Sequence, residues 1–155
     1  MATVNGVTVA ADTWGVVVGT GNGDHISGGS GNDTLEGTGG NDIYYGGAGN
    51  DTFIITASSL AASSGTTDNI NALAVIFDFQ GAGTWTSTNN DFLALTGFGA
   101  GSTLTFDHYG GTQTGALDVT QQYYTVHDTT TGNNYTIYIH SLDGSQIKAG
   151  DYAFY

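Results

Sequence analysis

The chain of 155 residues contains no cysteine and no proline, and Lys148 is its only lysine or arginine. Without cysteine there is no disulfide framework and no thiolate metal site. The formal net charge of −13 excludes nucleic acid as a partner, because nothing can neutralise phosphates, and it disfavours anionic membranes and polyanionic glycans. No apolar run approaches the ~20 residues of a membrane helix. The N-terminal residues do not follow the basic and apolar pattern of an ordinary secretory signal.

Glycine and aspartate are abundant instead. The chain has 26 glycines and 14 acidic residues, of which only Glu36 is a glutamate. Aspartate suits turns and metal ligands more than helix surfaces. The composition therefore directs attention to turns.

Four nine-residue units follow one another from residue 19 to residue 54: GTGNGDHIS, GGSGNDTLE, GTGGNDIYY and GGAGNDTFI. The sixth place of each unit is an aspartate: Asp24, Asp33, Asp42 and Asp51. The eighth place is always apolar: Ile26, Leu35, Tyr44 and Phe53. Val17 continues the apolar register one unit earlier. An internal repeat of this kind decides the fold before any other signal.

The unit predicts a tight turn followed by a short strand. Six residues rich in glycine, asparagine and aspartate can hold a turn with positive φ angles, and the last three suit a strand. Two units make one coil, so residues eighteen apart should lie ~4.8 Å apart across a parallel sheet. Asp24 then lies over Asp42 in a first stack of turns (19–24 and 37–42), and Asp33 over Asp51 in a second (28–33 and 46–51). The apolar eighth residues point inward.

Stacked carboxylates repel each other by roughly 1 kcal/mol at ~5 Å in water, and by more at lower dielectric. The repeat therefore needs a cation between its turns. Oxygen ligands without His or Cys favour Ca2+ over Mg2+ or Zn2+. The candidate ligands are the four aspartates and the turn residues Gly19, Gly21, Gly28, Gly29, Ser30, Gly31, Gly37, Thr38, Gly39, Gly40, Gly46, Gly47, Ala48 and Gly49.

These units resemble the RTX nonapeptide family, whose pattern is Gly-Gly-x-Gly-x-Asp-x-apolar-x. The second and fourth units match it fully, whereas the first has Thr20 and Asn22 for glycine and the third has Thr38. The resemblance implies a right-handed parallel β-roll with calcium in its turns.

The rest of the chain predicts further strands and almost no helix, so the expected fold class is all-β. Strands are expected over 74–79 and 91–98, with a hairpin of 123–127 and 135–140 across DTTTGNN. We expect residues 1–18 to form an N-terminal strand cap with Trp14 as its apolar plug, 19–56 the roll, and 57–155 an antiparallel, sandwich-like C-terminal part.

The order of elements after the repeats resembles the C-terminal region of serralysin-type metalloproteases and the R-modules of alginate C-5 epimerases. Asp78-Phe79 and the strand from Asp91 to Thr96 carry this resemblance. It implies that Asp78 and Asp91 are additional calcium ligands. Two acids of the family pattern are Ala74 and Ala94 here, and Asp68 is the candidate replacement for the first.

The chain ends in GDYAFY, an acid followed by apolar residues. This tail resembles the signal that the type I secretion machinery reads in the same family, and the alternative is an ordinary last strand. With Ca2+ as the expected cofactor, the tail predicts an extracellular or cell-surface location.

Catalytic motifs are missing from the sequence. There is no HExxH, and the glycines around Ser30 follow the repeat period instead of forming a nucleophile elbow. We therefore expect no enzyme. Two functions stay open. The first is a calcium-folded structural or self-assembling surface or matrix component. The second is a carbohydrate-binding, R-module-like accessory domain of a secreted polysaccharide-modifying enzyme that binds a neutral glycan.

Overall fold

The structure is a computed structural model of the chain, and it describes residues 3–5, 7–8, 16–60, 74–82, 89–113 and 116–155. Trp14 and Asp68 lie outside these residues, so the predictions made for them stay predictions.

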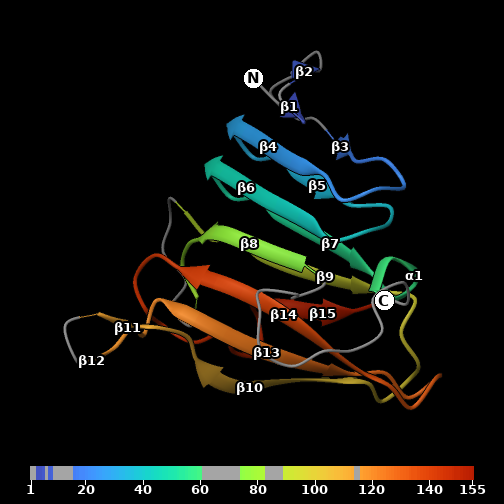
Figure 1. Ribbon diagram of the computed structural model, residues 1–155. Helices are drawn as coiled ribbons and strands as arrows, with labels where there is room; N and C mark the ends of the chain where they lie inside the picture. Colours follow the sequence, from blue (N-terminus) through green and yellow to red (C-terminus); the bar gives the residue numbers. More distant parts are fainter. Residues whose placement is uncertain (1–2, 6, 9–15, 61–73, 83–88, 114–115) are drawn as a thin grey trace.

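Two sheets face each other across a shared core (Figure 1). In order across the sheet, sheet A contains β10 (Thr103–Tyr109), β13 (Gln121–His127), β14 (Asn134–Ser141), β8 (Ala74–Phe79), β6 (Asp42–Ala48), β4 (His25–Ser30), β1 (Thr3–Val4) and β2 (Val7–Thr8). Sheet B contains β15 (Tyr152–Phe154), β9 (Phe92–Thr96), β7 (Thr52–Thr56), β5 (Thr34–Glu36) and β3 (Val16–Val18). The short α1 (Ala57–Leu60) and the pair β11 (Thr112–Gln113) and β12 (Ala116–Leu117) complete the described elements.

From β3 to β9 the chain alternates between the two sheets, and each strand pairs in parallel with the strand two places on. Ile26 lies beside Tyr44 in sheet A, and Leu35 lies beside Phe53 in sheet B. This register confirms the predicted coil of eighteen residues. The chain is all-β with parallel sheets, as a β-roll requires.

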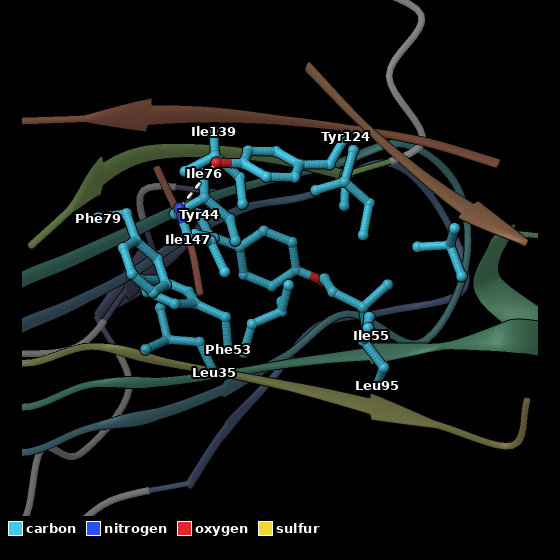
Figure 2. Close-up of a cluster of buried hydrophobic side chains, with 14 of the residues drawn as sticks. Leu35, Tyr44, Phe53, Ile55, Ile76, Phe79, Leu95, Tyr124, Ile139 and Ile147 are labelled. Carbon is cyan, nitrogen blue, oxygen red and sulfur yellow. Dashed lines mark hydrogen bonds between the residues drawn. The ribbon is translucent and has the colours of Figure 1, made fainter. Parts of the chain in front are cut away.

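The apolar eighth residues form the core between the sheets. Ile26, Leu35, Tyr44 and Phe53 are fully buried, and Val17 is nearly so. Figure 2 shows Leu35 and Phe53 on one side of this core and Tyr44 and Ile76 on the other. Full burial of one such side chain contributes roughly 1.5–3 kcal/mol. The Tyr124 hydroxyl, also in the core, accepts a hydrogen bond from the Ile147 backbone at 2.8 Å and secures the chain that leads into β15.

The C-terminal part continues the parallel stacking more than the sequence predicted. β8 and β9 extend the two sheets in parallel, and β14 and β15 then pair in parallel with β8 and β9. Antiparallel pairing is found between β10, β13 and β14, where Tyr123 lies opposite Tyr138 in the predicted hairpin. The apolar residues Ile76 and Leu93 continue the stacked core although the nine-residue period has ended.

At the other end, the β1–β2 hairpin pairs antiparallel with β4, and Asn5 in its turn has a φ of 50°. This hairpin forms the N-terminal end of sheet A, while β3 belongs to sheet B. The cap predicted for residues 1–18 stays a prediction. None of the helical segments in the described residues is long and apolar enough to cross a membrane.

Candidate metal centre

The predicted pairs of aspartates lie on top of each other. The backbone N–H of Asp24 donates to Asp42 Oδ1 at 3.1 Å in the first stack, and the N–H of Asp33 donates to Asp51 Oδ1 at 2.8 Å in the second. The later acid of each pair, Asp42 or Asp51, is thus held by the backbone of the turn one coil earlier. The second stack also carries a parallel ladder of asparagines, in which the Asn50 N–H donates to Asn32 Oδ1 and the Asn90 N–H to Asn50 Oδ1, both at 2.9 Å.

The asparagine ladder is a set of site residues that the sequence reading missed. A signal for it was present, because the fifth place of units two, three and four is always asparagine: Asn32, Asn41 and Asn50. A residue type that repeats at a fixed place in a stacked coil predicts a ladder.

The first glycine of each unit makes room for the carboxylate of the same unit. A Cβ added at Gly46 would lie 2.4 Å from Asp51 Oδ2, and one at Gly28 would lie 2.6 Å from Asp33 Oδ2. The turns also approach one another closely, since a Cβ at Gly47 (φ 98°) would lie 2.1 Å from the Gly29 carbonyl oxygen. These glycines are therefore required because the aspartate carboxylate occupies the space of a side chain and because neighbouring turns pack closely.

In the second stack one oxygen of each acid has no partner. Asp33 is 4% exposed and Asp51 is 1% exposed, and the Oδ2 atom of each accepts no hydrogen bond among the described residues. An unpaired buried polar group costs ~1–3 kcal/mol, and more if charged. Burial raises the pKa of Asp33, and it raises that of Asp51 to about 6, with the charges of Asp33 and Asp78 adding to the effect on Asp51. Two buried oxygens that lack donors are what a cation would satisfy.

The first stack is different, because both acids are bonded by side chains of the protein. Asp24 accepts from the Thr20 N–H, from the Thr20 hydroxyl at 2.9 Å and from Asn5 Nδ2 at 2.5 Å. Burial acts to raise the pKa of Asp24, but these hydrogen bonds outweigh it and the pKa is lowered.

Asp42 is hydrogen-bonded by the Tyr44 hydroxyl, which in turn accepts the Gly37 N–H at 3.0 Å. Burial raises the pKa of Asp42 to about 6, with a further contribution from the charge of Asp24. Side chains of the protein thus donate hydrogen bonds to both aspartates of the first stack.

Asp78 and Asp91 lie next to the second stack, on the side away from the N-terminus. The two oxygens of Asp78 accept the N–H groups of Gly46 and Gly47, both at 2.8 Å. Asp91 accepts the N–H groups of Asp51 and Gln80, both at 2.9 Å. Burial raises the pKa of Asp91 to about 7, helped by the charges of Asp51 and Asp78. In the first stack the next residue beside Asp42 is Ala74, so no acid continues that side.

Carboxylates alone do not make a metal cage here. Among the described residues, no three His, Cys, Asp or Glu side chains gather where they could hold one ion. A cation bound here would therefore need oxygen ligands other than side-chain carboxylates. Oxygen-only ligands with irregular geometry fit Ca2+ and do not fit Zn2+.

The comparison with protein families agrees with this chemistry. Residues 18–53 match the RTX calcium-binding nonapeptide repeat in four copies. This segment therefore consists of RTX repeats, which bind Ca2+, and calcium is its cofactor. No curated protein matches the chain in a sequence comparison.

Proposed function

We propose that Ca2+ binds between the stacked turns and that its binding folds the roll. The unpartnered, buried Oδ2 atoms of Asp33 and Asp51 carry this proposal. They would act with carbonyl oxygens of residues 28–31 and 46–49. The turns of the first stack, with Asp24, Asp42, Gly19, Gly21 and residues 37–40, are the second set of candidate ligands. Because a metal that binds only the folded chain adds its binding free energy to folding, the chain should order on calcium addition.

Circular dichroism of the full chain tests the coupling. In chelator we expect the signal of a largely disordered chain, and in millimolar Ca2+ the signal of a β-sheet protein, since extracellular modules work in this range. Mg2+ at the same concentration is the control and should not restore the sheet. An identical β-sheet spectrum in chelator and in Ca2+ would refute the proposal.

The role that best fits is a non-catalytic, exported structural protein that folds outside the cell. Its C-terminal residues support export of an unfolded chain. Tyr152–Phe154 form β15, which pairs with β9 and is half-buried in sheet B. A secretion machinery could read this tail only before sheet B forms. Low cytosolic calcium would keep the chain unfolded until it has left the cell.

Self-assembly at a surface or in a matrix is supported by the ends of sheet B. All five strands of this sheet are parallel, and among the described residues β3 and β15 have a partner on one side only. Val16 and Val18 in β3 are 64% and 49% exposed. A translated copy would place its β15 next to β3 in the same direction, which permits head-to-tail growth. Bound Ca2+ would offset part of the repulsion between acidic copies.

The glycan-binding alternative has less support. Aromatic rings do cross the outer face of sheet A, but they stack on one another. Tyr45 and Phe77 are stacked at 5.2 Å, and Tyr123 stacks on His108 at 4.6 Å. The face that each ring turns to its neighbour is not free to receive a sugar, and these pairs stabilise the sheet across its strands.

A further inference from the structure

We infer that the two stacks of turns are not equivalent. The second stack binds Ca2+ tightly, whereas the first is closed by the chain's own side chains and binds Ca2+ weakly. This inference rests on the proposed calcium function and goes beyond it, because a regular repeat by itself predicts equal sites.

The departures from the repeat pattern all fall in the first stack. Units one and three, which form it, have Thr20, Asn22 and Thr38 where the pattern has glycine, whereas units two and four match the pattern fully. The structure shows what two of these departures, Thr20 and Thr38, contribute. The hydroxyl of Thr20 donates to the carboxylate of Asp24 in the same turn, in addition to the backbone N–H that any residue there would carry.

Thr38 occupies carbonyl oxygens that a cation would otherwise need. Its hydroxyl reaches the turn one coil earlier and lies 2.5 Å from the Thr20 carbonyl oxygen and 3.2 Å from that of Gly19. The residue at the same place in the fourth unit is Gly47, which has no side chain to do this. A cation in the first stack would have to displace the Thr38 hydroxyl.

Tyr44 and Asn5 complete the closure. Of the four apolar eighth residues only Tyr44 carries a hydroxyl, and this group bonds Asp42 and accepts the Gly37 N–H. Asn5, from the turn of the N-terminal hairpin, donates to Asp24 and accepts the His25 N–H at 2.9 Å. Both acids of the first stack are therefore supplied with donors from inside the protein.

In the second stack the acids have no such side-chain donors, and Asp78 holds the turn 46–51 from the next coil. Asp33 Oδ2 and Asp51 Oδ2 are buried and unpartnered. Asp78 accepts the N–H groups of Gly46 and Gly47 at 2.8 Å, so once the chain is folded the turn 46–51 is oriented by the protein itself. A turn whose buried oxygens have no donors binds a cation without giving up hydrogen bonds. Each bond that the first stack must give up weakens its affinity about two- to tenfold.

The matched variants Asp33→Asn and Asp24→Asn test this in the full chain. Calorimetric titration of the unmodified protein with CaCl2 should show a tight step and a step about tenfold or more weaker. Asp33→Asn should remove the tight step and raise the Ca2+ concentration needed for the β-sheet spectrum. Asp24→Asn should leave the tight step unchanged. If both substitutions weaken the same step equally, the stacks are equivalent and the inference is wrong.

A variant that restores the pattern keeps the test decisive if either substitution prevents folding. Thr20→Gly, Thr38→Gly and Tyr44→Phe together remove three internal hydroxyl donors and leave those of Asn5 and of the residue-20 backbone in place. They should strengthen the weak step about tenfold or more. An unchanged weak step would overturn the inference. The failure of the proposed calcium function looks different, because the unmodified protein would then take up no Ca2+ at all.

Discussion

The backbone N–H of Asp51 donates to Asp91 Oδ1 at 2.9 Å across forty residues of sequence. The same geometry joins Asp33 to Asp51 within the repeats. Asp91 thus occupies the next position of the aspartate ladder, immediately before β9 and outside the RTX repeats.

Replacing Asp91 by alanine should destabilise the roll without changing the number of bound calcium ions. The substitution leaves the N–H groups of Asp51 and Gln80 without an acceptor, which costs ~1–3 kcal/mol for each buried group. The oxygens that lack partners belong to Asp33 and Asp51, and they are untouched. Thermal unfolding in Ca2+ and calorimetric stoichiometry measure the two effects. Asp107→Ala, at an exposed site beside His108, is the control for lost charge. A lower calcium stoichiometry would make Asp91 a ligand, as its resemblance to the serralysin pattern implied.

Gly46→Ala should weaken calcium binding and lower stability by ~1–3 kcal/mol, because the new Cβ meets Asp51 Oδ2 at 2.4 Å. Gly21→Ala is the matched control, since a Cβ there meets nothing within 4 Å and Gly21 has no positive φ. The melting temperature and the calcium affinity should both fall in Gly46→Ala and stay unchanged in Gly21→Ala. Equal losses at both glycines would point to backbone entropy as the cause.

Acidification should favour the calcium-free fold. Burial, with help from neighbouring charges, raises the pKa values of Asp42 and Asp51 to about 6 and that of Asp91 to about 7. These values lie above the ~3.9 of an unfolded aspartate, so the folded state binds protons more tightly. This stabilisation is fully present below about pH 4 and is lost as the pH rises through about 6 to 7.

Far-ultraviolet circular dichroism of calcium-free protein, dialysed at several values between about pH 5 and pH 8, measures this effect. The β-sheet signal should be strongest at the acid end of this range. With Ca2+ the trend should reverse, because protons compete with the cation for the same carboxylates. A calcium-free signal that grows toward alkaline pH would contradict the assignment of raised pKa values.

Lysines placed on the exposed strand β3 should suppress self-association. Val16→Lys with Val18→Lys introduces the charges that natural proteins use to protect sheet edges. Leu142→Lys with Val119→Lys, at residues that are 50% and 46% exposed and outside both sheets, controls for the same change in net charge. Light scattering in millimolar Ca2+ should show large particles for the unmodified chain and for this control, and fewer for the β3 variant. Scattering that does not depend on β3 would exclude growth through this edge.

The sequence predicted the roll and its register because both follow from a period that is written four times. It placed Asp24 beside Asp42 and Asp33 beside Asp51, and the predicted hairpin of β13 and β14 is confirmed. The parallel pairing of β8 with β6 and of β9 with β7 was not predicted. The nine-residue period ends at residue 54, and no spacing relates Ile76 to Tyr44.

The difference between the two stacks could not be predicted from the pattern either. Tyr44 satisfies the apolar eighth place as well as Phe53 does, and only the folded coil brings its hydroxyl to Gly37 and Asp42. Asn5 lies outside the repeats, and its bond to Asp24 depends on the β1–β2 hairpin lying beside β4. Such contacts depend on tertiary structure, whereas the ladder depends on period alone.

The parallel pairing of β15 with β9 and of β14 with β8 has a consequence for the order of folding. The coils of the repeat close short loops between neighbouring units, whereas Leu93 must find Tyr152, and Ile76 must find Ile139, across most of the C-terminal half. Closing a longer loop costs more entropy, and such non-local pairings form slowly. The strands of the repeats should therefore pair first, and the later strands should then add to the sheets that they form.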